Sequence, residues 1–268
     1  MYKHWIETYK SNKLNKVILC FFGVISRSIK NTYNSIEKNI INVLKNKGID
    51  VDIYVFNLDI GNSKIDGKRI NQSDINIIPY TYLETYSQSE LDKDIDIFCK
   101  NISCKMRSDY DNTTIRNSIR QMYSEYRVGL FLEKHLDKYD TAIVCGPDYY
   151  LLNNININDV EQSNHNNNIY TTRVNDAEGY TNGFYIGNLR TIIKILKRYE
   201  NITSFYPTNK DYEYLLKKSF EDNNIKRLVT NMLFFKIRAN LNIARQGIMK
   251  HSNYNSLYNQ IKNILSTK

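Results

Sequence analysis

The sequence predicts an α/β fold built on a mixed, mostly parallel sheet that is flanked by helices. Three successive segments lead to this prediction. Residues 16–23 are an apolar run that ends in glycine, as expected of a strand buried on both faces. A helical pattern follows, and residues 51–57 then form a second apolar run. A strand, a helix and a strand in this order make a βαβ unit, whose two strands are parallel.

The helix of this unit is expected from apolar side chains that recur at helical spacing between residues 33 and 44. Ser28 or Asn31 is its expected N-cap, and Gly48 is its expected end. A polar stretch follows the second strand, and residues 77–80 are predicted as a short third strand.

A long amphipathic helix is predicted at residues 113–135, followed by another apolar strand at residues 139–148. This strand ends in Gly-Pro-Asp. Open α/β sheets bind their ligands beyond the carboxyl ends of the strands. Asp148 therefore stands where a site is expected.

The second half of the chain gives weaker patterns. An Asn-rich stretch at residues 155–168 is predicted as a surface loop. The remaining expected elements are strands at 169–174, 181–188 and 232–238, and helices at 189–199, at 211–222 and at the end of the chain. No internal repeat and no linker is visible. We expect an N-terminal arm at residues 1–15 and a single domain at residues 16–268.

Positive charge is concentrated at the C-terminal end of the sequence. The formal net charge is +9, and the segment 223–268 contains no Asp or Glu. Its cations are Lys226, Arg227, Lys236, Arg238, Arg245, Lys250, Lys262 and Lys268. Such a segment attracts phosphate groups, whether they belong to a nucleotide, a nucleic acid or a membrane. A solvated basic face without a ligand explains it equally well.

Several classes of protein are excluded or disfavoured. The longest apolar run near the start, residues 17–25, is far shorter than the roughly 20 residues of a membrane-spanning helix. We expect a cytoplasmic protein without a transmembrane segment, in the host cytoplasm or virion if it is viral. The four cysteines form no Cys-x-x-Cys pair, which favours reduced thiols. Glycine-rich dinucleotide, P-loop, zinc-protease and serine-hydrolase motifs are absent, and the four histidines have no ligand spacing.

Two elements remain as candidates for chemistry. The loop at residues 23–28 leads into a helix N-terminus, where backbone N–H groups and Arg27 could hold a phosphate. Asp148 could bridge a divalent cation to a diphosphate. The structural alternatives are an N-cap with a solvent-facing Arg27, and a turn residue after Pro147.

The same segments carry a family resemblance. The opening from Lys16 to Ser28 resembles that of bacterial and giant-virus glycosyltransferase-like proteins. The strand ending in Gly146-Pro147-Asp148 resembles their strand that ends in the Asp-x-Asp region of GT-A nucleotide-sugar transferases. Residues 182–188 resemble the later strand that borders the sugar and acceptor pocket. The three elements occur in the family's order and span most of residues 16–240.

This resemblance implies a GT-A-like, Rossmann-like fold, a nucleotide diphosphate sugar as donor, and a glycan, protein or small molecule as acceptor. It also implies Mn²⁺ or Mg²⁺ near Asp148, which is the predicted metal ligand. The nucleotide-sugar site that it implies consists of Phe22, Gly23, Arg27, Asn57, Arg120, Tyr123, Asp148, Asn182 and Gly183. A true Asp-x-Asp at residues 109–111 is the alternative metal site.

A transferase of this kind also needs a base for the acceptor hydroxyl and cations for the departing diphosphate. Asp176 and Glu178, between two late strands, are the predicted catalytic carboxylates. Arg238 or Lys250 of the basic segment would stabilise the diphosphate.

Two other functions stay open. The motif at Asp148 has no second carboxylate, so a catalytically silent protein of the same fold that binds nucleotide or glycan is the first alternative. The acid-free segment could instead bind nucleic acid, although the 22 tyrosines are scattered and no RNA- or DNA-binding motif accompanies them. Nucleic acid is therefore the weakest of the three partners.

Overall fold

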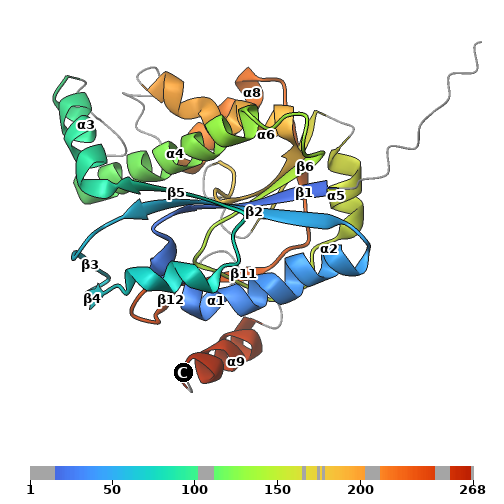
Figure 1. Ribbon diagram of the computed structural model, residues 1–268, viewed down its shortest axis with the longest axis horizontal. Helices are drawn as coiled ribbons and strands as arrows, with labels where there is room; N and C mark the ends of the chain where they lie inside the picture. The colour runs from blue at the N-terminus through green and yellow to red at the C-terminus, as the bar shows by residue number, and fades with distance from the viewer. Residues whose placement is uncertain are drawn as a thin grey trace, which may run out of the picture.

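A computed structural model describes residues 16–101, 112–164, 167–173, 176, 179–202, 212–244 and 254–266. Its centre is a seven-stranded sheet with the order β10-β8-β9-β6-β1-β2-β5 (Figure 1). The strands are β1 (Lys16–Gly23), β2 (Asp50–Asp59), β5 (Tyr82–Ser87), β6 (Thr141–Cys145), β8 (Asn168–Thr171), β9 (Phe184–Asn188) and β10 (Lys226–Val229). Only β9 runs antiparallel to its neighbours among these strands. The predicted α/β fold with a mixed, mostly parallel sheet is confirmed.

Strand β1 lies in the interior of the sheet, between β6 and β2, and its side chains are apolar on both faces. Val17, Leu19 and Phe21 pack into one cluster of buried side chains. Their neighbours Ile18 and Cys20 pack into a second cluster on the opposite face. The alternation follows from the two-residue period of a strand, and it requires a helical layer on each side.

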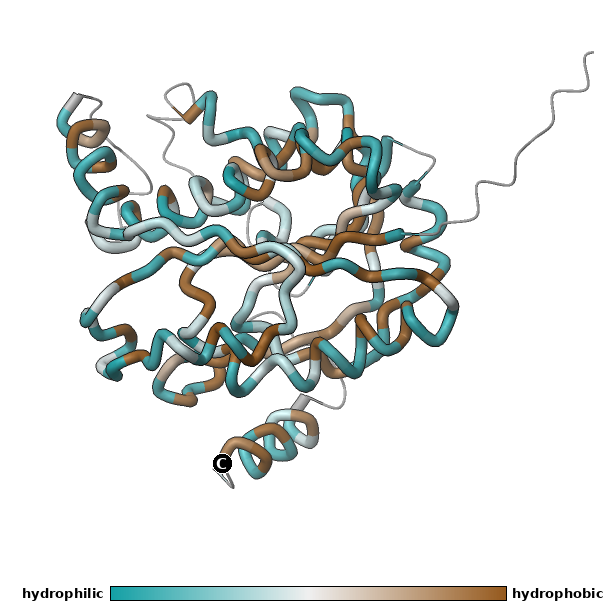
Figure 2. Tube along the Cα trace, in the orientation of Figure 1, coloured by the Kyte–Doolittle hydropathy of each residue, from teal (hydrophilic) through white to brown (hydrophobic). Residues whose placement is uncertain are grey.

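Helices cover both faces of the sheet (Figure 1). On one face lie α4 (Asn112–Glu133), α6 (Leu189–Leu196) and α8 (Tyr212–Asp222), and α3 (Gln88–Asn101) packs against α4. On the other face lie α1 (Ile29–Ile36), α2 (Asn42–Asn46) and α5 (Ile157–Ser163). Figure 2 shows hydrophobic residues concentrated along the central strands and hydrophilic residues along the outer sides of the helices.

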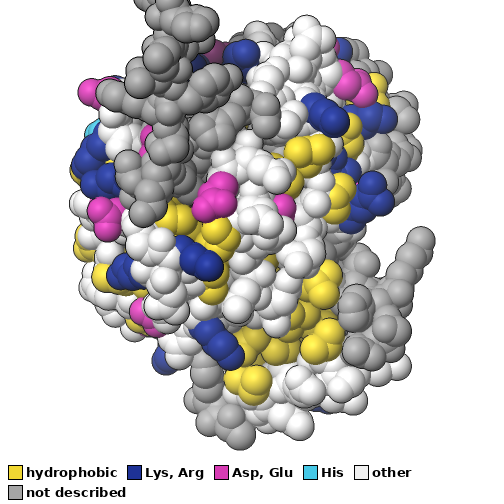
Figure 3. Space-filling view, turned by 90° about the vertical axis from the view of Figure 1, so that its right-hand side faces the viewer, with side chains coloured by type: hydrophobic (Ala, Val, Ile, Leu, Met, Phe, Trp, Pro, Cys, Tyr) yellow, Lys and Arg dark blue, Asp and Glu magenta, His cyan; other side chains and the backbone are white. Residues whose placement is uncertain are grey.

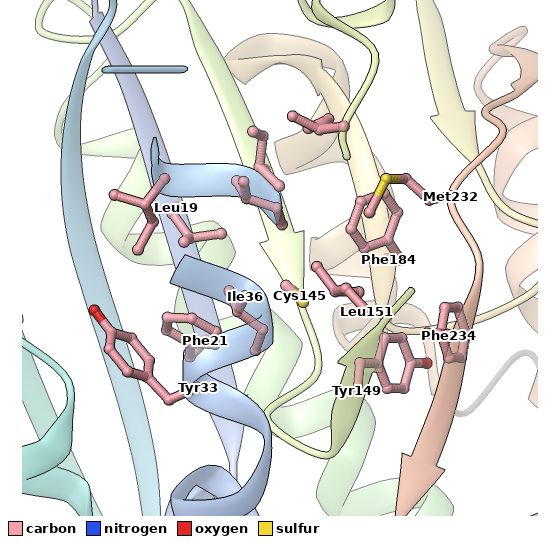
Figure 4. Packing of buried hydrophobic residues seen from close by; sticks show 14 of the residues in the cluster. Leu19, Phe21, Tyr33, Ile36, Cys145, Tyr149, Leu151, Phe184, Met232 and Phe234 are labelled. Carbon is pink, nitrogen blue, oxygen red and sulfur yellow. The ribbon is translucent and has the colours of Figure 1, made fainter. Parts of the chain in front are cut away.

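A second, smaller sheet lies on the face of α1. It has the order β12-β11-β7 and consists of β7 (Tyr149–Leu151), β11 (Phe234–Ile237) and β12 (Ile243–Ala244). The rings of Tyr149 and Phe234 stack with centroids 3.9 Å apart, among the buried side chains of Figure 4. This sheet joins the chain just after β6 to a segment near its C-terminal end. The last helix, α9 (Tyr254–Ser266), packs through Ile261 and Leu265 into the same cluster.

Several predicted elements differ from the structure. Residues 77–80 are not a strand, since a 3₁₀ helix, η3 (Gln72–Ile77), leads to the edge strand β5 at residues 82–87. The predicted Asn-rich loop contains α5, which Asn156 caps by accepting a hydrogen bond from the N–H of Asn158. The predicted first helix is continuous, but its middle, η2 (Glu37–Ile41), is π-helical.

The connections between parallel strands change from one face of the sheet to the other next to β1. The connection from β1 to β2 runs through α1 and α2 on one face, and the connection from β5 to β6 runs through α3 and α4 on the other. Because β1 lies between β2 and β6, these connections leave a crevice beyond the carboxyl ends of β1 and β6. None of the helices in the described part of the chain is both long and apolar enough to cross a membrane.

Candidate functional site

A cavity of about 680 Å³ opens at this crevice. Its lining comes from the ends of β1, β2 and β6, from the first half of α4, and from β11. The hairpin of β3 (Lys64–Ile65) and β4 (Lys68–Arg69) contributes to one side. Seven of the predicted site residues line this cavity: Phe22, Gly23, Arg27, Arg120, Asp148, Asn182 and Gly183.

Two glycines shape the cavity because their backbones adopt left-handed conformations. Gly23 ends β1 with φ +95°, and Gly183 precedes β9 with φ +84°. A Cβ atom at Gly183 would lie 2.7 Å from the hydroxyl oxygen of Tyr149, so no larger residue fits there without a shift. The Tyr149 hydroxyl donates to the carbonyl of Asn182 at 2.5 Å, and the Gly146 N–H donates to the carbonyl of Gly183 at 2.8 Å. These bonds fix the ends of β6 and β9 against each other.

Arg27 lies at the start of the first helical segment, where the sequence predicted a phosphate contact. Its guanidinium forms a bidentate pair with Asp66 of the hairpin, with Nη2 at 3.0 Å from Oδ2. The same carboxylate accepts a hydrogen bond from the N–H of Ala239 at 3.1 Å. Asp66 thus joins the hairpin to Arg27 and to the turn after β11.

Lys236 is the cation that the sequence did not single out. Pairing of β11 with β7 places it opposite Tyr149, and its Nζ lies 5.3 Å from the centre of that ring. Burial lowers the pKa of Lys236, and the positive charges of Arg238 and Arg27 lower it further, whereas the charges of Asp148 and Glu213 raise it. Among the described residues no ion pair and no hydrogen bond engages this ammonium group.

Asp148 lies in the turn between β6, which ends at Cys145, and β7, which begins at Tyr149. Its carbonyl accepts a hydrogen bond from the N–H of Ile237 at 2.8 Å, which anchors the turn to β11. Its carboxylate lines the cavity and, in the described part of the chain, accepts no hydrogen bond. The negative charge of Asp148 contributes to the raised pKa of Cys145 and of Tyr149, after the larger effect of burial.

Glu213 is a carboxylate of the cavity that sequence analysis missed. It lies in the first turn of α8 and lines the cavity. Its Oε1 lies 3.4 Å from Nδ2 of Asn182, and its charge acts on Lys236. The cavity therefore has acids on two sides of one ammonium group.

Arg120 lines the cavity but is engaged within the protein. It forms a bidentate pair with Asp92 of α3, with Nη2 at 2.7 Å from Oδ2. Its Nη1 donates to Asn117 at 2.8 Å. The contact of Arg120 with a donor, implied by the resemblance, would require this pair to open or to be shared.

Three predicted residues do not line the cavity. Asn57 is buried, and its Oδ1 accepts a hydrogen bond from the N–H of Ile25 at 3.3 Å. Tyr123 packs against other rings, including Tyr199 at 5.4 Å between centroids. Asp176 pairs with Arg227 at 2.6 Å and also accepts hydrogen bonds from Thr181.

Asn57 therefore holds the backbone at Ile25, and Asp176 forms an ion pair with Arg227. Glu178, the other predicted catalytic carboxylate, lies outside the described residues, as do Lys250, the Asp-x-Asp of residues 109–111 and the arm at residues 1–15.

A buried ion pair supports the cavity from the side of the α4 layer. Glu125 of α4 and Arg198 of η4 (Lys197–Asn201) pair at 2.6 Å, and their side chains are 0% and 1% exposed. Glu125 also accepts a hydrogen bond from Tyr212 at 3.0 Å and one from Tyr185 at 3.4 Å. Tyr212 lines the cavity, and the hydroxyl of Tyr185 accepts a hydrogen bond from the N–H of Gly183.

The resemblance implies a metal ion near Asp148. Within the described part of the chain, no group of three or more His, Cys, Asp or Glu side chains is arranged around one point. Asp148 could provide one oxygen ligand, and phosphate oxygens and water could complete the shell of Mn²⁺ or Mg²⁺. The predicted metal at Asp148 stays a prediction.

The basic segment does not form one continuous surface in the described residues. Lys236 and Arg238 line the cavity, Arg227 pairs with Asp176, and Lys226 and Lys262 are exposed. On the face seen in Figure 3, Lys and Arg side chains lie scattered, while hydrophobic side chains gather toward its lower end. Models of known protein families and the curated proteins gave no match to this chain.

Proposed function

We propose that the protein is a glycosyltransferase of the GT-A type that transfers a sugar from a nucleotide diphosphate donor to a glycan, protein or small-molecule acceptor. One observation carries the proposal. A cavity at the switch point of a mostly parallel sheet combines Asp148 at the end of β6 with Arg27, Lys236 and Arg238. Cations gathered at this position suit a diphosphate group.

The lining also suits the rest of such a donor. Apolar side chains of Phe22, Val24 and Leu58 lie at the ends of β1 and β2 and could cover a base or ribose. The diphosphate would then lie toward Arg27 and β11, and the sugar toward Asn182 and Gly183. Mn²⁺ or Mg²⁺, where bound, would take Asp148 as its protein ligand and withdraw charge from the diphosphate.

Transfer of the sugar forms one bond, breaks another and moves one proton. The acceptor oxygen forms a bond to the anomeric carbon, and the bond from that carbon to the diphosphate oxygen breaks, so its electron pair leaves with the nucleotide. The acceptor proton must pass to a base. Because Asp176 is engaged by Arg227 outside the cavity, Glu213 is the carboxylate whose position supports this role.

Thermal unfolding tests whether the protein binds a nucleotide donor. We expect one of UDP, GDP and CDP, or a sugar conjugate, to raise the Tm selectively, since a ligand at 100 times its Kd adds about 2.7 kcal/mol of stability. Each nucleotide is measured with and without MnCl₂, and Asp148→Asn is compared with Asp50→Asn, which removes an exposed acid at the other end of β2. Absence of any nucleotide shift would contradict the proposal.

Release of nucleotide from the conjugate tests the chemistry. Glu213→Gln is expected to lower turnover by about 100-fold or more with little change in donor affinity, whereas Asp176→Asn acts through stability. Selective donor binding without any release, over a broad acceptor screen, would favour the catalytically silent alternative. Binding of RNA or DNA that falls steeply with salt, without a nucleotide shift, would favour the nucleic-acid alternative.

A further inference from the structure

Lys236 sits in the cavity because of strand pairing. Its partner in β7 is Tyr149, the residue that follows Asp148, and the adjacent Ile237 donates to the carbonyl of Asp148 at 2.8 Å. A shift of β11 by one residue would turn Lys236 to the opposite face of this small sheet. The register therefore fixes an ammonium group beside the acid that ends β6.

The ammonium group of Lys236 has acidic neighbours but no direct ion pair among the described residues. Its nitrogen lies over the ring of Tyr149, and no described carboxylate forms an ion pair with it. Asp148 and Glu213 attract it, while Arg27 and Arg238 repel it. Burial of a cation that has no direct ion pair costs free energy, and a further negative charge that enters the cavity would offset this cost.

The charges in the cavity match a diphosphate. Arg27, Lys236 and Arg238 come from η1 (Ile25–Arg27), from β11 and from the turn after it, and all three line the same cavity. The charged side chains of the lining are five basic ones, Arg27, Lys64, Arg120, Lys236 and Arg238, and three acidic ones, Asp66, Asp148 and Glu213. Arg27 is paired with Asp66 and Arg120 with Asp92, and the lining as a whole still carries more positive than negative charge. A diphosphate group could accept hydrogen bonds from all three side chains.

We infer that Lys236 binds the diphosphate of the donor directly, flanked by Arg238 and Arg27, and that nucleotide binding does not require a divalent cation. The inference rests on the proposed function, because it takes the ligand to be a nucleoside diphosphate. It assigns to a lysine the charge neutralisation that the resemblance assigned to a metal at Asp148.

Calorimetric titration tests this inference. The nucleoside diphosphate that gives the largest thermal shift is titrated into the protein in EDTA and in MnCl₂. We expect binding in both. Lys236→Met is expected to weaken it about 10- to 100-fold, as the loss of one charge-assisted hydrogen bond does. Lys236→Arg is expected to retain most of the affinity, and Lys45→Met, an exposed change on α2, all of it.

The ligand-free proteins separate binding from folding. Lys236→Met removes a charge that burial disfavours, so its Tm without ligand is expected to equal or exceed that of the wild type. A fall in Tm together with loss of binding in both Lys236→Met and Lys236→Arg would overturn the inference.

The outcomes distinguish this inference from the proposed function. Binding only in MnCl₂, unaffected by Lys236→Met, would overturn the role of Lys236 and leave the transferase intact. Absence of nucleotide binding would instead remove the proposed function, and inorganic diphosphate then serves as the probe. Its binding in EDTA and its loss in Lys236→Met would support the diphosphate site, and the absence of such binding would remove that too.

Discussion

Two groups of charged side chains flank Gly183 and are built in opposite ways. Glu125 and Arg198 pair directly and are buried, and Glu125 also accepts hydrogen bonds from Tyr212 and Tyr185. Lys236 faces its nearest acids without an ion pair among the described residues. The first arrangement satisfies its charges within the protein, and the second leaves charge for a ligand. The comparison separates a structural charge pair from a binding site.

The largest effect is expected from breaking the buried pair. Glu125→Gln keeps the shape of the side chain but leaves Arg198 buried without an anion, which should lower the free energy of unfolding by roughly 3–5 kcal/mol. Urea denaturation measures the change. Glu133→Gln removes the half-exposed partner of Lys197 and is expected to cost less than about 1 kcal/mol. Equal losses of stability in the two variants would contradict the structural role of the buried pair.

Gly183→Ala tests the boundary between the two groups. The left-handed backbone conformation and the approach of Tyr149 should together lower stability by about 1–3 kcal/mol. The displaced Tyr149 should also weaken nucleotide binding, because Lys236 lies over its ring. Gly48→Ala is the control, since its φ is +73° and a Cβ there meets open space. If both variants cost the same, the contact with Tyr149 contributes nothing.

The smallest effect is expected at Asp159, which is buried and has one carboxylate oxygen without a partner among the described residues. Burial raises its pKa, so folding is disfavoured once pH exceeds the ordinary value near 3.8, and the penalty is complete above the raised value. Asp159→Asn should therefore stabilise the protein by about 1 kcal/mol at pH 7.

The gain at Asp159→Asn should disappear below the ordinary pKa, where the wild-type acid is protonated in both the folded and the unfolded state. Denaturation at pH 3 and pH 7 measures it. Asp159 does not line the cavity, so nucleotide affinity should stay unchanged. A change in affinity would contradict the assignment of nucleotide binding to the cavity.

The sequence predicted best those elements whose burial is complete. Strands β1 and β6 are apolar on both faces, so each gave an uninterrupted apolar run. The edge strand β5 is partly exposed and mixes polar with apolar residues, so no such run marked it. Helix α5 consists of poor helix formers, and its formation depends on the Asn156 cap and on the burial of Val160.

The residues of the candidate site also differ in how far the sequence could identify them. Arg27 and Asp148 could be found because they follow strands, and position at a strand end is a local property of the sequence. Lys236 lies within an apolar strand, and only its pairing with β7 brings it to the cavity. The engagement of Asp176 by Arg227 joins residues 51 positions apart and has no local signal.

The cavity is also a late product of synthesis. The hydroxyl of Ser28 donates to the carbonyl of Ile237 at 2.5 Å, across 209 positions of the chain. Contacts over such separations form slowly, because a long loop must close before they stabilise the fold. A nascent chain that has completed β9 already carries Arg27 and Asp148 but lacks β11. The ligand binding that we propose for Lys236 could therefore begin only once β11 has emerged from the ribosome and docked.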